Sequence, residues 1–282
     1  MFDTFKNRLE ITGKLTTITA LRISAGRSTE PIGTDLPVIK DALGQPLIPG
    51  SSFKGALRSR LESFLRGIDP SLAEDPADFT TTTRNNEVKY LKDKYKDNDF
   101  QLTENLLEMT DLISRLFGSP WIASKFQIRD LNVVPNTWFG QYQERDGVAI
   151  DRDTETAADG KLYDFQVVPA STEFQFHAIV ENAEPWELGL LMIGLHQFET
   201  EQIPLGGGRS RGLGVVKLNI EKMRWVDVED DPKFMLQYLQ KLVMGDETAY
   251  EDAADYRDEW VHQLIDHLNK QISQKDATQT TA

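Results

Sequence analysis

The sequence predicts an α+β fold, because strand and helix patterns alternate along its 282 residues. β-branched residues dominate residues 9–23, and hydrophobic residues alternate strictly with others in 174–180, as they do in strands. In 53–64 hydrophobic residues recur every three or four positions, as on one face of a helix. Further strand patterns at 125–134 and 215–225 and an apolar helix at 185–198 complete the order. This order predicts a ferredoxin-like, split βαβ sandwich.

The first strand, with a bend predicted at Gly13, leads into a long loop at 24–50 whose prolines and glycines prevent a continuous helix. Within that loop, residues 41–48 have the composition of a small hairpin turn. The following helix is predicted to begin with Ser51 or Ser52 as its N-cap. Lys54 and Arg58 are four residues apart, so they share one face near the start of this helix.

The middle of the chain predicts an insertion, a further helix and a long arm. Residues 67–101 are polar and have no clean period, which indicates an exposed insertion. An amphipathic helix over 102–118 then ends at Gly118. In 137–168 two extended segments flank a polar tip, which predicts a long arm.

A glycine-rich loop at 204–214 connects the apolar helix to the last strand. Gly206, Gly207 and Gly208 could bring backbone N–H groups against a phosphate, and Arg209 and Arg211 would add guanidinium donors. The loop matches neither a Walker A motif nor a dinucleotide fingerprint, because no Gly-Lys-Ser/Thr follows and the next element is a strand. A connection that merely needs positive φ angles explains the loop equally well.

The net charge of −14 is unevenly distributed. Residues 1–66 hold ten Lys and Arg and six Asp and Glu, whereas 221–282 hold seven and fourteen, and acidic amphipathic helices are expected in that last segment. Because nucleic-acid binding depends on the local field, a basic groove near the N-terminus remains compatible with this total. The absence of cysteine excludes disulfides and a thiolate nucleophile. No apolar run approaches the ~18 residues of a membrane helix, so a cytoplasmic protein is expected.

The candidate acid–base and metal-ligating residues are few. Asp35 and Asp41 are six residues apart in the proline-rich loop, and the simplest interpretation is that both are surface carboxylates. The four histidines lack metal-ligand spacing and are expected to have structural or solvated roles. No residue is assigned as a metal ligand.

Five motifs follow one another along the chain: LRISAG, TDLPVIKDALGQPLIPGSSFKGALRSRLE, LFGSPWIASKFQIRDL, RDGVAIDRDTETAADGKLYDFQVVPASTEF and GGGRSRGLG. Together they resemble the RAMP superfamily, over roughly residues 9 to 220. More narrowly, the chain resembles the backbone subunit that repeats along the guide RNA in type III CRISPR effector complexes.

The resemblance implies a modified ferredoxin-like palm, of the kind found in RNA-recognition motifs, over residues 1–220. It implies a thumb β-hairpin at 137–168 and leaves 221–282 as an acidic helical extension. The resemblance also implies that guide RNA contacts these residues of the palm: Arg22, Ser51, Ser52, Lys54, Arg58, Gly206, Gly207, Gly208, Arg209 and Arg211.

Asp35 occupies the position of an aspartate that cleaving members of the family need to cut target RNA. The family chemistry is an attack by the ribose 2′-OH that depends on a divalent metal, here expected to be Mg²⁺. The implied partners are guide RNA, target RNA and other CRISPR effector subunits, including neighbouring RAMP proteins, and no membrane. Two alternatives stay open: a non-catalytic guide-binding subunit, and a standalone RNA-processing nuclease, which would need a histidine or a basic and tyrosine set near the glycine-rich loop.

Overall fold

The computed structural model describes residues 4–27, 34–150, 157–228 and 231–280, and only the backbone of 148–150, 157–162 and 274–280. Its strands are β1 (Asn7–Thr17), β2 (Leu47–Ile48), β3 (Phe126–Ile128), β4 (Leu131–Asn132), β5 (Gln143–Ile150), β6 (Ala157–Val167), β7 (Glu173–Glu181), β8 (Val216–Asp227) and β9 (Glu251–Asp252). Its α-helices are α1 (Gly50–Ile68), α2 (Thr82–Lys94), α3 (Asp99–Glu108), α4 (Leu112–Phe117), α5 (Pro185–Glu199), α6 (Pro232–Val243) and α7 (Arg257–Thr280). Short 3₁₀ turns are η1 (Pro70–Leu72), η2 (Asp78–Thr80), η3 (Arg209–Arg211), η4 (Glu247–Ala249) and η5 (Ala254–Tyr256).

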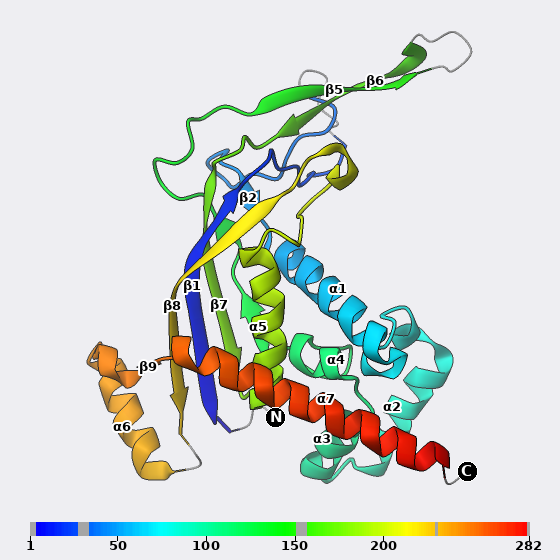
Figure 1. Ribbon diagram of the computed structural model, residues 1–282, viewed down its shortest axis with the longest axis vertical. Helices are drawn as coiled ribbons and strands as arrows, with labels where there is room; N and C mark the ends of the chain where they lie inside the picture. Colours follow the sequence, from blue (N-terminus) through cyan, green and yellow to red (C-terminus); the bar gives the residue numbers. More distant parts are fainter. Residues whose placement is uncertain (1–3, 28–33, 151–156, 229–230, 281–282) are drawn as a thin grey trace.

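The main sheet has five strands in the order β3-β7-β1-β8-β9, and neighbouring strands are antiparallel (Figure 1). In chain order β1, α1, β3, β7, α5 and β8 form a βαββαβ unit whose first strand lies between the third and the fourth. This is the split βαβ arrangement, so the predicted α+β, ferredoxin-like fold is confirmed. The small strand β9 extends the sheet at the β8 edge.

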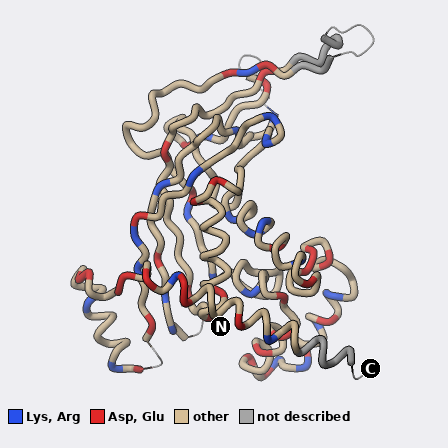
Figure 2. Tube along the Cα trace, in the orientation of Figure 1, with Lys and Arg blue, Asp and Glu red and all other residues tan. Residues whose placement is uncertain are grey.

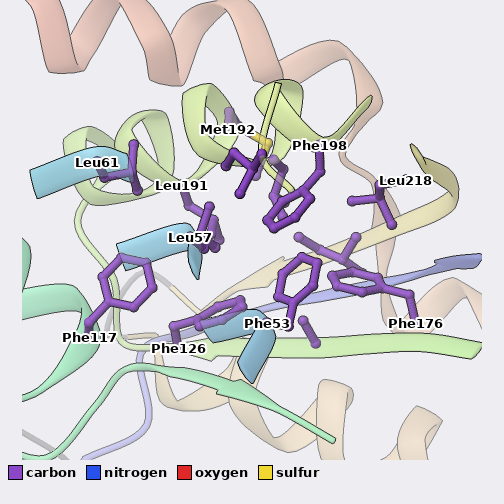
Figure 3. Packing of buried hydrophobic residues seen from close by; sticks show 14 of the residues in the cluster. Phe53, Leu57, Leu61, Phe117, Phe126, Phe176, Leu191, Met192, Phe198 and Leu218 are labelled. Carbon is purple, nitrogen blue, oxygen red and sulfur yellow. The ribbon is translucent and has the colours of Figure 1, made fainter. Parts of the chain in front are cut away.

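The hydrophobic core lies between the sheet and the helices α1 and α5 (Figure 3). Phe53, Leu57 and Leu61 of α1 are fully buried, as their helical spacing predicted. The Phe53 ring stacks on Phe198 of α5 with centroids 4.3 Å apart, and lies 5.2 Å from the Phe176 ring of β7. Burial of each such side chain contributes roughly 1.5–3 kcal/mol, which fixes α1 and its N-terminal loop against the sheet.

Strands β5 and β6 form a long antiparallel hairpin that projects away from the sheet (Figure 1). It occupies the segment in which the thumb hairpin was expected. Gly147 lies opposite Tyr163, and a Cβ atom at Gly147 would come within 2.3 Å of the Tyr163 ring. Glycine at this position leaves room for the Tyr163 ring to lie across β5.

Three local expectations differ from the structure. Ser51 and Ser52 are not the N-cap: Pro49 holds that position without a side-chain bond, and Asp130 Oδ1 accepts the Gly50 N–H at 2.8 Å. The helix expected over 102–118 is two helices, because Asp111 caps α4 by accepting the Ser114 N–H. The first strand ends at Thr17 instead of residue 23. The two helix differences depend on contacts that helical periodicity does not encode.

The expected insertion at 67–101 contains η1, η2, α2 and the beginning of α3. The expected boundary at residue 220 falls within β8, so the division into a palm and an extension stays a prediction. In α7, Trp260, Leu264 and Leu268 are buried on one face, as expected of an amphipathic helix in this segment. Among the described helices, none is long and apolar enough to cross a membrane.

Candidate functional site

The loop that carries Asp35 is bound to the base of the β5–β6 hairpin through its backbone. The Leu36 N–H donates to Asp164 O and the Gln166 N–H donates to Leu36 O, both at 3.1 Å. Asp35 itself is half-buried, and its Oδ2 accepts the Asp164 N–H at 3.3 Å. The carboxylate of Asp35 is thus held beside β6 by its own hydrogen bond and by the two backbone hydrogen bonds of Leu36.

Asp35 lies in an acidic neighbourhood at this end of the hairpin. Asp146 pairs with Asp164 across the two strands, and Thr34 Oγ1 donates to Glu144 Oε1 at 2.7 Å. Reduced solvation, followed by the hydrogen bond and charge of Asp146 and the charges of Asp35 and Glu144, raises the pKa of Asp164 above its usual value. In the part of the chain that the structure describes, no group of three or more His, Cys, Asp or Glu could hold a metal ion. The residues beside Asp35 therefore do not form a complete metal site by themselves.

Asp41, the second carboxylate of the motif, forms the predicted turn. Its Oδ1 accepts the N–H groups of Leu43 and Gln45, each at 2.8 Å, and Gly44 adopts a positive φ of 76°. The Tyr142 hydroxyl donates to Gly44 O at 2.7 Å and so ties the turn to the segment before β5. Asp41 has a structural role in this turn.

The glycine-rich loop packs against the backbone at Arg22. The Gly207 N–H donates to Arg22 O at 2.8 Å, and Gly206, with φ of 72°, lies so close that a Cβ atom there would be 2.1 Å from the same oxygen. Gly208 also has a positive φ, of 77°. These angles show that Gly206 and Gly208 are needed for the connection itself. Arg209 and Arg211 follow on η3 with exposed side chains.

Arg22 connects the glycine-rich loop to the hairpin. Its guanidinium lies over the Phe165 ring of β6, 4.5 Å from the centroid. Its buried Nε has no hydrogen-bond partner among the described residues. The structure thereby brings Arg22, the glycine-rich loop and the Asp35 loop together around the base of the hairpin.

Lys54 and Arg58 were expected to bind phosphate, but their side chains bond within the protein. Lys54 Nζ donates to Ser124 Oγ at 2.6 Å and to Phe126 O at 3.1 Å. Burial, together with the charge of Arg58, lowers the pKa of Lys54 to about 8. Arg58 donates to Glu62, Ser114 and Gly118 at 2.7, 3.0 and 2.9 Å. Both cations thus fasten α1 to the segment around α4 and β3.

A cavity of about 330 Å³ separates the outer face of α1 from the glycine-rich loop. It is lined by Gly55, Ala56, Ser59, Arg60, Ser63, Gln202, Ile203, Pro204 and Arg209. Arg60 was not among the predicted contacts with guide RNA. It lies two residues after Arg58 in the sequence and therefore on a different face of the helix. Ser51 and Ser52, in contrast, lie at the start of α1 and do not line this cavity.

Comparison with known proteins agrees with the family that the sequence motifs indicated. The family model described as "RAMPs: RAMP superfamily" matches residues 14–217. A protein of Enterococcus italicus described as "CRISPR system Cms endoribonuclease Csm3" is 26% identical over 219 residues, which cover 77% of this chain and 92% of that relative.

Two further proteins with the same description match shorter segments. The protein of Mycobacterium tuberculosis is 48% identical over 56 residues, and that of Methanocaldococcus jannaschii is 45% identical over 60 residues. These segments cover 19% and 21% of this chain, and 24% of each relative. Since the family model spans most of the βαββαβ unit and the hairpin, the chain belongs to the RAMP superfamily.

Proposed function

We propose that this chain is a backbone subunit of a cytoplasmic type III CRISPR complex that binds guide RNA and cleaves complementary target RNA. The observation that supports this most is the backbone bonding of the Asp35 loop to the base of the hairpin. A long hairpin that enters the guide–target duplex would carry Asp35 to a fixed place beside it. The three relatives described as endoribonucleases agree with this proposal.

The proposed guide path follows the cavity between α1 and the glycine-rich loop. Arg60 and Arg209 line it, and Arg22 and Arg211 extend the positive charge on either side of the glycines. Guanidinium groups suit phosphate oxygens because they offer forked donors. Ser51, Ser52 and the backbone N–H groups of Gly206 and Gly208 add neutral donors, whereas the Gly207 N–H already donates to Arg22 O. Lys54 and Arg58 contribute mainly through their charge, since most of their donors are bound within the protein.

In the proposed reaction, Asp35 orients the ribose 2′-OH of the target and accepts its proton as the 2′-oxygen bonds to the adjacent phosphorus. The bond from that phosphorus to the 5′-oxygen of the next nucleotide breaks, which leaves a 2′,3′-cyclic phosphate, and water supplies the proton that the departing 5′-oxygen takes up. The hydrogen bond from the Asp164 N–H would keep the Asp35 carboxylate oriented during this step. The proposal includes a requirement for Mg²⁺, which the family resemblance implies. The described carboxylates do not provide a complete set of ligands for the ion, and no step is assigned to it.

One observation favours the alternative of a non-catalytic guide-binding subunit. Asp35 Oδ2 already accepts a backbone hydrogen bond from β6, so its carboxylate also has a structural use. A neighbouring subunit would then perform the cleavage. A catalytic Asp35 needs its negative charge for cleavage of target RNA even when the hydrogen bond from the Asp164 N–H is kept. In a non-catalytic subunit, an uncharged residue that keeps this hydrogen bond would leave cleavage unchanged.

The experiment is target-RNA cleavage by the assembled complex, purified through a tag on this chain, with and without Mg²⁺. Asp35→Asn keeps an oxygen that can accept the Asp164 N–H, whereas Asp35→Ala removes both the charge and the acceptor. Asp41→Asn is the matched control in the same loop. We expect both Asp35 variants to bind target RNA but to cut it ~100-fold or more slowly, and Asp41→Asn to cut normally. Unchanged cutting by a fully assembled Asp35→Asn complex would favour the scaffold alternative.

A further inference from the structure

The Asp35 loop is bonded to both strands of the hairpin, and the two attachments lie on either side of Asp35. Leu36, one residue after Asp35, is bonded to β6 through its backbone. Thr34, one residue before Asp35, is bonded to β5 through its side chain, because its Oγ1 donates to Glu144 Oε1 at 2.7 Å. The backbone of Asp35 is therefore fixed between two anchor points on different strands.

The bond between Thr34 and Glu144 is shielded from water at one end. Thr34 is 8% exposed, whereas Glu144 lies on the exposed surface of β5. A hydroxyl that donates to a carboxylate forms a charge-assisted hydrogen bond, which is stronger than a bond between neutral groups. A buried hydroxyl that loses its acceptor also pays for its lost solvation. Thr34 therefore favours a loop position in which the Glu144 carboxylate is within reach.

The hydrogen bond of the Asp35 side chain itself is longer than the Thr34 bond. Asp35 Oδ2 accepts the Asp164 N–H at 3.3 Å, beyond the ~2.9–3.0 Å that is most common for such bonds. A bond of this length restrains the carboxylate only weakly, so its direction depends on the backbone anchors at residues 34 and 36. Direction matters for the reaction, because a displacement of ~1 Å can slow an enzymatic step ~100-fold.

Glu144 keeps this hydrogen bond within acidic surroundings. Acidic residues lie on both strands of the hairpin (Figure 2). Asp146, two residues after Glu144, shares its face of β5, and Asp164 lies opposite Asp146 on β6. Like charges that face each other across two strands repel. Removal of the Glu144 carboxylate would relieve part of this repulsion, so a loss of cleavage after such a change is not expected to come from a weakened hairpin.

We propose that Thr34 and Glu144 are positioning residues for the cleavage of target RNA, and that their hydrogen bond keeps the Asp35 carboxylate at the ribose 2′-OH. This inference rests on the proposed role of Asp35 and adds that β5, as well as β6, sets the position of the loop. Neither side chain touches the RNA. Thr34 acts through the backbone that it shares with Asp35, and Glu144 acts through Thr34. Loss of their bond therefore affects the rate of cutting and leaves the binding of RNA intact.

The test measures single-turnover cleavage of target RNA by the assembled complex, purified through a tag on this chain. Thr34→Val removes the hydroxyl at nearly constant shape, and Glu144→Ala removes the acceptor. We expect both variants to cut ~10- to 100-fold more slowly, with unchanged affinity for target RNA and unchanged retention of guide RNA. Thr34→Ser and Glu144→Gln keep the hydrogen bond and should restore most of the lost rate. Gln143→Ala, at the exposed neighbour of Glu144 on the other face of β5, is the matched control and should cut normally.

The double variant Thr34→Val with Glu144→Ala distinguishes one shared bond from two separate effects. If the residues act through their bond, the double variant should cut no more slowly than either single variant. Slow cutting by Thr34→Val together with normal cutting by Glu144→Ala would overturn the proposal, because Thr34 would then act on the RNA directly. Loss of target binding in parallel with the loss of cutting would also overturn it, since the bond would then only support the fold.

The Asp35→Asn complex, measured in the same assay, separates this inference from the proposed function. If Asp35→Asn cuts slowly while Thr34→Val and Glu144→Ala cut normally, only the positioning role is wrong. If Asp35→Asn cuts normally, the proposed catalytic function is wrong, and the positioning role is overturned with it.

Discussion

Gly206→Ala is a direct test of the contact between the glycine-rich loop and Arg22. Gly206 has a φ of 72°, and an added Cβ would lie 2.1 Å from the Arg22 carbonyl oxygen. Gly212 provides a matched control in the same loop. Its φ is 78°, but no heavy atom lies within 4 Å of the position that a Cβ would take. Alanine at either site has the same backbone strain, and only alanine at 206 has the collision.

The expected magnitudes follow from these two differences. A left-handed conformation costs a residue other than glycine ~1–2 kcal/mol, which is the whole loss expected for Gly212→Ala. Gly206→Ala must also move a backbone oxygen that is about 1.3 Å short of the 3.4 Å at which ordinary contact begins. Forced repacking of this kind costs a further ~1–3 kcal/mol. The free energy of unfolding should therefore fall by ~2–5 kcal/mol.

Urea denaturation of the two variants measures the difference in stability, and co-purification of guide RNA measures its effect on the site. The displaced loop should hold Arg209 away from the cavity beside α1, so Gly206→Ala should retain guide RNA ~10-fold less well. Gly212→Ala should retain it normally. Equal stability and equal RNA retention in the two variants would refute the contact between Gly206 and Arg22 as the feature that positions the loop.

Two further predictions concern one buried and one half-buried lysine. Lys125→Met should lower the free energy of unfolding by ~3–5 kcal/mol, because Glu187, bonded to Lys125 Nζ at 2.5 Å, would stay buried without its partner. Lys125→Met with Glu187→Gln should recover most of this loss in urea denaturation, and no recovery would contradict the ion-pair explanation. Because the pKa of Lys54 is lowered from 10.5 to about 8, the unfolded chain binds more protons than the folded chain between these values. The stability of the wild type relative to Lys54→Met should thus rise with pH from about 8 to 10.5 and be flat below 8, and a flat difference throughout would show that Lys54 has an ordinary pKa.

Local patterns in the sequence were sufficient for the elements that build the palm. Phe53, Leu57 and Leu61 predicted the buried face of α1, and alternation in β7 predicted the inward Phe174 and Phe176. Both inferences hold because a helix or strand repeats at a fixed period and buries one side. The hairpin was predictable for a similar reason, since two extended segments flank a polar tip.

The roles of single polar residues were not predictable from local pattern. Lys54 bonds to Ser124 and Phe126, and Gly50 is capped by Asp130, all at least 70 residues away in sequence. The inward direction of Lys54 depends on how the segment around β3 returns to α1. The acidic neighbours of Asp35 likewise come from β5 and β6, more than 100 residues later. Chemistry that depends on such distant pairs becomes visible only in the folded chain.

The parallel bridge between Leu36 and Phe165 has a consequence for how this protein can change in evolution. A strand inverts the direction of its side chains at each residue, so one residue inserted between Phe165 and Val168 would turn the Asp35 loop to the other side of β6. Residues added beyond Gly147, toward the hairpin tip, would leave this alignment unchanged. Lineages of this chain are therefore expected to vary in the length of the hairpin toward its tip and to keep the number of residues at its base constant.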